Sequence, residues 1–352
     1  MSSSFGQGCV AVRHMSCSVG TGSSTNSMMH PGQWQVSVGF RNLHSYKHFV
    51  GADYQPAREA AGTNVINGQQ AFDLGVTYSV TDRLSVAFNL PFSFNYRTSL
   101  YEHYGNALAG NPAQKRFGTM ANGIGDARLT ASYWLLDPLK HMKGNLSVGL
   151  GVKLPTGDYK AMDKFHRRAS DGSDYTIEKP VDQSIQLGDG GVGINVEIQG
   201  YQQLFSRTSL YYNGFYMSNP KNVNSAANVA PDKVVTDEMV RFMSVADQYA
   251  GRVGLNYALA PKAGIGATLG ARIEGIPAYD LIGGSDGFRR PGYVFSIEPG
   301  ISYSTAKNTL FVSLPIATQR NRIKSASDWA NNKHGDAAFA DYIITATVTH
   351  RF

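Results

Sequence analysis

The chain has 352 residues, of which 32 are Lys or Arg and 26 are Asp or Glu. Charged residues therefore make up 16%, against about 25% in an average globular protein. No stretch approaches the roughly 18 uncharged apolar residues of a membrane helix, which excludes a helical membrane protein, and the 42% hydrophobic content argues against disorder. Basic residues are scattered among acids, so no nucleic-acid partner is expected. An all-β protein rich in Gly and aromatic residues remains, either a large soluble one or a membrane β-barrel.

Period-two alternation of apolar and polar residues, the signature of β-strands, recurs along the whole chain. Phe72, Leu74, Val76, Tyr78 and Val80 form one such apolar set. The alternation predicts about twelve strands, near residues 34–40, 72–80, 84–96, 127–135, 146–154, 192–198, 207–217, 253–259, 265–273, 293–303, 310–316 and 342–352. Bacterial outer-membrane barrels have an even number of strands.

The connections between the predicted strands alternate in length. Short turns are expected at 81–83, 136–144, 201–206, 260–263 and 304–308, and long polar segments at 41–70, 97–122, 156–184, 218–247, 276–290 and 318–338. Outer-membrane barrels combine short periplasmic turns with long extracellular loops, whereas a soluble sandwich has no reason for this asymmetry. The pattern also predicts that both chain termini are periplasmic.

The apolar faces of the predicted strands have the composition of a lipid-facing surface. They carry no Asp, Glu, Lys or Arg, and a basic residue there would cost about 2–4 kcal/mol at the bilayer midplane. Aromatic residues such as Trp34 and Tyr133 gather near the ends of these faces, as in interfacial girdles. The sequence therefore predicts an all-β fold, an antiparallel transmembrane β-barrel of about twelve strands in the bacterial outer membrane.

The two ends of the chain carry further signals. The last strand closes on Phe352 and resembles the C-terminal sorting strand of Gram-negative outer-membrane proteins, which implies the barrel assembly machinery as a partner. Residues 1–30 are expected to form an N-terminal periplasmic arm or plug, followed by the barrel in 31–352. Within the arm, Cys9 and Cys17 predict a local disulfide. A thiol metal site is the alternative, but the spacing matches no standard ligand pattern.

Several sequence segments resemble those of one family of outer-membrane barrels, the MetA-pathway phenol-degradation (transporter-like) proteins. They are residues 73–92, 122–133, 149–158 and 298–303, which follow one another in a similar order of strands, tight turns and Leu-Pro strand exits. The resemblance covers roughly 71–158 and 250–352. It implies an outer-membrane protein that passes small, often hydrophobic or aromatic molecules.

The strand face opposite to the apolar one is expected to line the lumen. It carries five acids and five bases, namely Asp73, Asp126, Glu197, Glu274, Glu298, Arg128, Lys153, Arg252, Arg272 and Arg351. These charges either ring a narrow polar pore that binds a small solute or pair across the lumen and close it, and both interpretations stay open. Their balance argues against a strongly anion- or cation-selective pore.

Short motifs elsewhere lack the context that their chemistry needs. Residues 188–193 are Gly-rich but precede no Lys-Ser/Thr pair and enter a strand, so tight backbone passage is favoured over phosphate binding. His14 and Ser16 precede the barrel, and His44 and His48 lie in an expected loop without the Glu of a zinc helix. No catalytic site, metal or cofactor is expected, and the protein is not expected to be an enzyme.

Two functional hypotheses follow from the sequence. The first is an outer-membrane channel or transporter for a small solute, hydrophobic or aromatic according to the resemblance. The alternative is a closed structural barrel that docks partner proteins of an envelope complex through its loops or its N-terminal arm. Outer-membrane lipid and lipopolysaccharide are expected partners in both cases.

Overall fold

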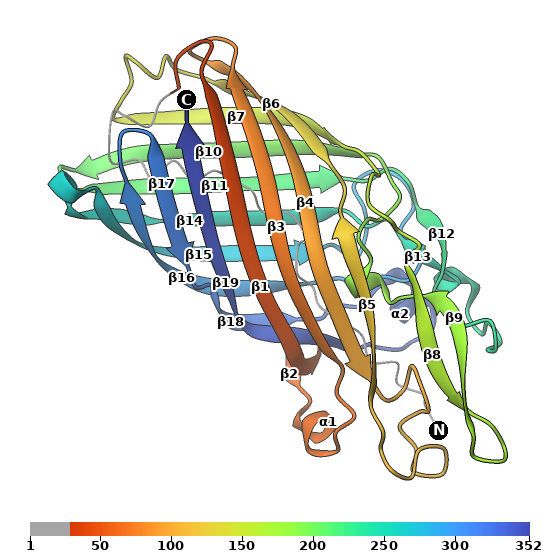
Figure 1. Ribbon diagram of the computed structural model, residues 1–352. Coiled ribbons are helices and arrows are strands. Elements are labelled where there is room, and N and C mark those ends of the chain that lie inside the picture. The colour runs from red at the N-terminus through yellow and green to blue at the C-terminus, as the bar shows by residue number, and fades with distance from the viewer. Residues whose placement is uncertain (1–28) are drawn as a thin grey trace.

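The computed structural model describes residues 29–352, which form a closed barrel of antiparallel strands (Figure 1). The predicted arm or plug of residues 1–30, with Cys9 and Cys17, lies outside the described residues except for its last two positions. No helix in the described part of the chain is long and apolar enough to span a membrane.

Twelve strands close the barrel, as the sequence predicted, and two of them are interrupted. The continuous strands are β1 (Trp34–Val50), β3 (Ile66–Ser79), β4 (Leu84–Ser99), β7 (Gly144–Lys153), β10 (Gly193–Phe205), β11 (Thr208–Ser218), β14 (Gln248–Ala260), β15 (Ile265–Ile276), β16 (Gly292–Ser304) and β19 (Ala337–Arg351). The interrupted strands are β5 (Phe117–Ile124) with β6 (Arg128–Trp134), and β17 (Asn308–Ser313) with β18 (Ile316–Asn321). Antiparallel pairing of β19 with β1, from Arg351 opposite Gln35 to Ala337 opposite Phe49, closes the ring.

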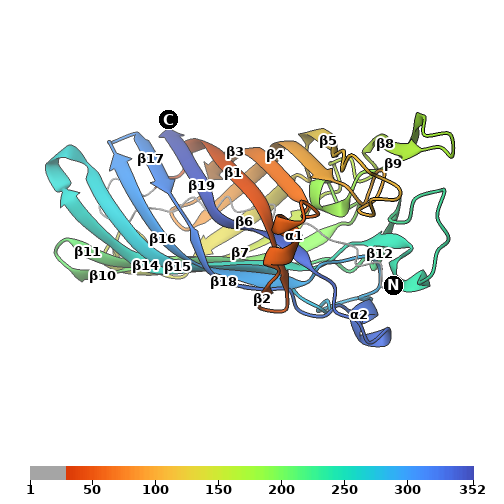
Figure 2. The same ribbon diagram turned by 90° about the horizontal axis from the view of Figure 1, so that it is seen from below.

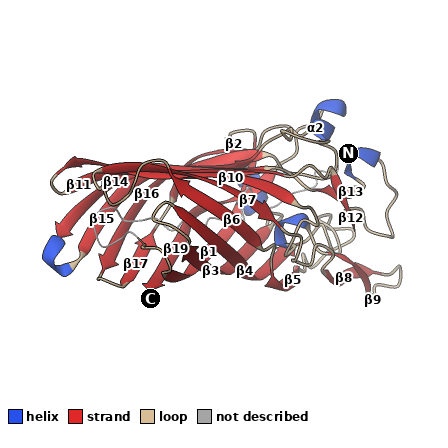
Figure 3. Ribbon diagram, turned by 90° about the horizontal axis from the view of Figure 1, so that it is seen from above, coloured by secondary structure: helices blue, strands red, loops and turns tan. Residues whose placement is uncertain are grey.

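The remaining strands and the two α-helices gather at one end of the barrel, opposite the C-terminus (Figures 1 and 2). They belong to the long loops and are β2 (Asp53–Tyr54), α1 (Pro56–Ala60), the hairpin β8 (Met162–Arg168) with β9 (Asp174–Pro180), the pair β12 (Val223–Ala227) with β13 (Phe242–Ser244), and α2 (Ala326–Ala330). The C-terminus and the start of β1 lie at the other end, which holds the short turns. The predicted asymmetry of the connections is confirmed, and strands dominate the whole molecule (Figure 3).

The strands are longer than their apolar faces indicated. β10 pairs with β11 as far as Phe205 opposite Thr208, so the turn expected at 201–206 consists only of residues 206 and 207. β4 likewise continues to Ser99, inside the segment expected as a loop from residue 97. Backbone pairing requires no apolar side chain, so the ladder extends beyond the lipid-facing band.

The outer surface of the barrel is apolar and its interior is polar. On β7, Val148, Leu150 and Val152 are 39%, 63% and 40% exposed, while the alternating Ser147 and Lys153 are each 1% exposed. A water-soluble protein buries its large apolar side chains, whereas a membrane barrel exposes rows of them to lipid. The prediction of a transmembrane barrel is therefore confirmed.

The break between β5 and β6 is repaired by one side chain. The Thr156 hydroxyl donates to the Gly125 carbonyl oxygen and accepts from the Ala127 N–H, both at 2.8 Å. The break between β17 and β18 falls at Pro315, which has no N–H to donate to a ladder. The sequence predicted strands only at 127–135 and 310–316, so most of β5 and of β18 was expected in the long segments 97–122 and 318–338.

Candidate functional site

A loop segment enters the barrel from the end that carries the long loops. It covers residues 181–191, between β9 and β10, and its Val181, Ile185 and Leu187 are almost completely buried. These three apolar side chains pack with Ala121 of β5 against the inside of the wall. The segment turns at a single 3-10 turn, Gln183–Ile185. We call residues 181–191 the inner segment.

Asp182 fixes the beginning of the inner segment. Its carboxylate accepts hydrogen bonds from the Ser184 N–H at 2.9 Å and the Ser184 hydroxyl at 2.7 Å, which caps the 3-10 turn. Arg290, from the loop before β16, donates to both carboxylate oxygens, one of them at 2.8 Å. Nη2 of Arg97, on β4, lies 3.5 Å from the same carboxylate.

Two buried guanidinium groups thus meet one buried carboxylate. Burial acts to raise the pKa of Asp182, but the charges of Arg290 and Arg97 together with the Ser184 hydrogen bond hold that pKa well below its usual range. Arg97 also donates to Glu102 at 2.8 Å and to Asn67 at 2.9 Å. The inner segment is therefore fastened to β3, β4 and the loop before β16 through one ionised side chain.

A second ion cluster fixes the far end of the inner segment. Asp189 forms an ion pair with Lys153 of β7. Asp126, at the break between β5 and β6, accepts from the Asp189 N–H at 3.1 Å and from the Gly157 N–H at 3.0 Å. Asp126 and Lys153 were both proposed from the sequence, and their charged atoms lie 3.7 Å apart. Asp189 was not among the sequence candidates.

The Gly-rich residues 188–193 give the chain room beside these ions. A Cβ at Gly188 would lie 2.6 Å from the Gly157 carbonyl oxygen, and Gly190 has a φ of +76°. The backbone therefore passes where only glycine fits without strain. This arrangement agrees with the interpretation of tight passage that the sequence favoured.

The other charged candidates are two ion pairs and four further residues. Arg252 and Glu298 lie 3.3 Å apart between β14 and β16, and Arg272 and Glu274 lie 2.6 Å apart along β15. Ser313 also donates to Glu298, at 2.6 Å. The further residues are Arg128, which is 3% exposed, the partly exposed Asp73 and Glu197, and Arg351, which donates to Gln35 at 3.1 Å near the end of the barrel.

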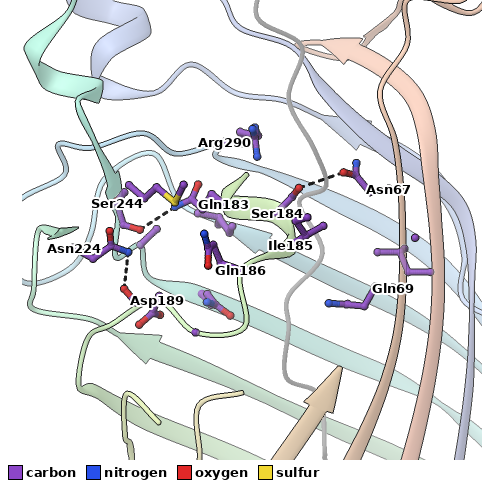
Figure 4. A pocket seen from close by; sticks show the side chains of 17 residues that line it. Asn67, Gln69, Gln183, Ser184, Ile185, Gln186, Asp189, Asn224, Ser244 and Arg290 are labelled. Carbon is purple, nitrogen blue, oxygen red and sulfur yellow. Dashed lines mark hydrogen bonds between the residues drawn. The ribbon is translucent and has the colours of Figure 1, made fainter. Parts of the chain in front are cut away.

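A cavity of about 60 Å³ remains between the inner segment and the wall (Figure 4). It has room for roughly four water molecules. Asn67 and Gln69 of β3 line it on one side, and Gln183 and Gln186 of the inner segment face them. Ser244 of β13 is also part of the lining.

The loop between β11 and β14 holds the inner segment from outside. The Gln183 amide donates to the Ser244 carbonyl oxygen at 2.9 Å, and Asn224 donates to the Asp189 carbonyl oxygen at 2.9 Å. Lys221 donates to the Gly190 carbonyl oxygen at 2.7 Å. The two long loops are therefore joined by hydrogen bonds where they meet.

Arg97, Asp182 and Arg290 were not predicted from the sequence, because all three fall in segments that were expected to be external loops. One signal was present: Val181, Ile185 and Leu187 are apolar residues grouped within or beside a long polar connection. Such residues need a buried partner surface, and in a barrel that surface lies within. His48 was considered as a metal ligand, but its ring bonds Asp336 at 2.9 Å and accepts from the Val65 N–H at 2.8 Å.

Comparison with known proteins supports the fold. No family model matches the chain, and no curated protein matches it. The crystal structure of the COG4313 outer membrane channel from Pseudomonas putida F1 matches with a TM-score of 0.58 at 12% identity, over 92% of this chain and 97% of that one. The β-domain of the Bordetella autotransporter BrkA has a TM-score of 0.47 at 12% identity, over 91% and 100% of the two chains. The Ralstonia pickettii toluene transporter TbuX has a TM-score of 0.45 at 10% identity, over 94% and 93%.

The first of these matches carries the conclusion on fold. Its near-complete coverage of both chains shows that the present chain has the architecture of a bacterial outer-membrane barrel. Together with the apolar outer surface, this fold confirms the predicted location in the bacterial outer membrane, in contact with lipid and lipopolysaccharide.

Proposed function

We propose that the protein is an outer-membrane channel for a small solute, with the inner segment as its constriction. The observation that carries the proposal is a closed barrel with a polar interior in which, among the residues that the structure describes, a small cavity remains beside residues 181–191. The match that fixes the fold is itself described as an outer membrane channel. A transport role is favoured over an enzymatic one for the same reasons.

The charged residues of the inner strand face are proposed to line the pathway. Pairs such as Arg252 with Glu298 compensate the charge of both members and leave the neighbouring small residues to border the solute path. Buried charges of this kind tolerate loss of a partner badly, so they also fix the barrel interior in one arrangement. The ten sequence candidates thus combine a structural role with the lining role proposed here.

The solute is proposed to be small and uncharged or weakly polar. The resemblance to the MetA-pathway proteins extends this class to hydrophobic or aromatic molecules. Leu43 and Ile276, which line the cavity, provide an apolar side that such a molecule requires. Phe352 is proposed as the sorting residue that the barrel assembly machinery reads during insertion.

Single-channel recording in planar lipid bilayers tests the proposal. We expect small, steady conductance steps from the purified full chain, since the constriction leaves room for only a few waters. Absence of any conductance above the lipid background would contradict the channel function. A heat-modifiable band in gel electrophoresis, recorded on the same sample, establishes that the barrel is folded.

The second candidate function is docking of partner proteins at the loop end. It is favoured by large apolar side chains exposed on the loops, namely Leu108, Val234, Leu281 and Trp329, which are 66%, 85%, 71% and 61% exposed. Apolar side chains exposed outside the membrane band are candidate contact points for another protein. A folded barrel without conductance that co-purifies with a defined envelope protein would favour this candidate.

A further inference from the structure

The cavity beside the inner segment has two charged residues in its lining, and both charges are already compensated. Arg290 donates to both oxygens of the Asp182 carboxylate. Asp189 is paired with Lys153 and also accepts from the Gly191 N–H at 2.9 Å. An ion entering the cavity would lose its water without meeting an opposite charge that is available, which is strongly unfavourable.

Most of the side-chain amide groups around the cavity also have hydrogen-bond partners within the protein. Gln186 donates to the carbonyl oxygens of Val181 and Ala161 and accepts from the Ala161 N–H at 3.0 Å. Asn224 donates to Asp189 and accepts from the Ala226 N–H at 2.9 Å. These amides hold the loops in place and form the frame of the cavity.

Two oxygen atoms of the lining differ from these amides in their hydrogen bonding. Oγ of Ser244, a residue only 1% exposed, and Oε1 of Gln248 are both buried and have no hydrogen-bond partner among the residues that the structure describes. A buried polar atom without a partner costs about 1–3 kcal/mol. An amide oxygen can only accept, so a molecule that relieves this cost must bring an O–H or N–H group.

The lining also has an apolar part. Leu43, Ile185 and Met243 are 4%, 1% and 1% exposed and border the same cavity. A ligand that fits has an apolar side next to a hydrogen-bond donor. The volume of about 60 Å³ admits a molecule of roughly four or five non-hydrogen atoms, by comparison with water.

We propose that this cavity is a binding site for a small uncharged solute that donates a hydrogen bond to Gln248 and Ser244 and places its apolar side on Leu43 and Met243. The inference rests on the proposed channel function and narrows the solute class. Carboxylates are disfavoured because they bring only acceptors to Gln248. Ammonium ions are disfavoured because Asp182 and Asp189 are already neutralised.

Saturation-transfer NMR on the detergent-solubilised full chain tests this site without requiring conduction. The probes are acetamide, which has an N–H donor, and dimethyl sulfoxide, which has the same number of non-hydrogen atoms and no donor. We expect saturable transfer to acetamide and at least threefold weaker transfer to dimethyl sulfoxide. Equal signals from both would overturn the inference and leave ordered water as the only occupant.

Matched variants locate the binding. Gln248→Met keeps the length of the side chain but removes the acceptor, and we expect acetamide affinity to fall about three- to tenfold, the value of one neutral hydrogen bond. Ser244→Ala is the second variant and should weaken binding in the same direction. Gln199→Met makes the same exchange on β10, away from the cavity lining, and should leave the affinity unchanged. Unchanged affinity in both cavity variants would overturn the proposal.

The outcome for the site and the outcome for the channel are separable. A chain that binds acetamide at Gln248 but shows no conductance would retain the site and lose the channel function. A chain that conducts but binds both probes equally would retain the channel function and lose the proposed solute class.

Discussion

Replacing Asp182 with asparagine should release the inner segment. The substitution preserves the shape of the side chain but removes the charge that Arg290 contacts with two hydrogen bonds and Arg97 approaches at 3.5 Å. Both guanidinium groups are less than 4% exposed, so they are left buried without their shared counter-charge. Removal of one partner from a buried ion pair costs about 3–5 kcal/mol.

This cost destabilises the conformation in which the inner segment is bound inside the barrel. The barrel wall itself is little affected, because backbone hydrogen bonds between its strands hold it together. Since 1.4 kcal/mol corresponds to a factor of ten, the ratio of open to closed segment should rise by roughly two to four orders of magnitude. Single-channel recording of Asp182→Asn should therefore show larger or more frequent open states than the unmodified protein. Asp53→Asn, an exposed position on β2, is the matched control and should behave as the unmodified protein.

Two results would refute this reasoning. The first is an Asp182→Asn barrel that is folded by the gel-shift criterion and conducts as the unmodified protein does. The second concerns pH. The pKa of Asp182 is held well below its usual range, so its contribution to the closed state is fully present above the unfolded pKa near 4 and is lost only as pH falls through the depressed folded value. Opening between pH 6 and pH 4.5 would show that another group controls the segment.

Three further predictions concern the barrel and its loops. Thr156→Val should lower the free energy of unfolding by about 1–3 kcal/mol, because it leaves two backbone groups unpaired at the break between β5 and β6. Denaturant unfolding measures this change, with Thr77→Val as the control. Leu150→Arg places a charge on the lipid face and should cost about 2–4 kcal/mol in folding into lipid vesicles, whereas Leu108→Arg, on a loop, should cost little. Burial lowers the pKa of His103 to about 4, so the folded loop favours the neutral ring and loses stability as pH falls from about 6.5 to 4. Protease protection of that loop should decrease over this range, and a protection independent of pH would contradict the argument.

The barrel could be predicted because lipid outside and a polar interior impose a local alternating pattern on the sequence. Each residue of a transmembrane strand faces either lipid or the interior, so residues 146–154 alternate whatever their neighbours are. The breaks at Gly125 and Pro315 were not predicted. They change a few backbone hydrogen bonds and leave the alternation on each side intact.

Only part of the candidate site could be predicted from the sequence. Asp126 and Lys153 were expected to share the inner face because their strand positions set the direction of their side chains. Their contact with Asp189 depends on a loop that folds back into the barrel. The count of five acids and five bases on the strands also grows once Arg97, Arg290, Asp182 and Asp189 join the interior, two of each sign.

By itself, the sequence determined the fold class, the membrane that the protein inhabits, the sidedness of its loops and the inner face of each strand. These properties follow from period and length, which are local features of a chain whose two faces meet different solvents. Only the tertiary structure decided what occupies the lumen. Asp182 and Arg290 are 108 residues apart, and no periodicity brings them together. Their pairing arises because a charged loop placed inside a barrel must find its counter-charges on the wall.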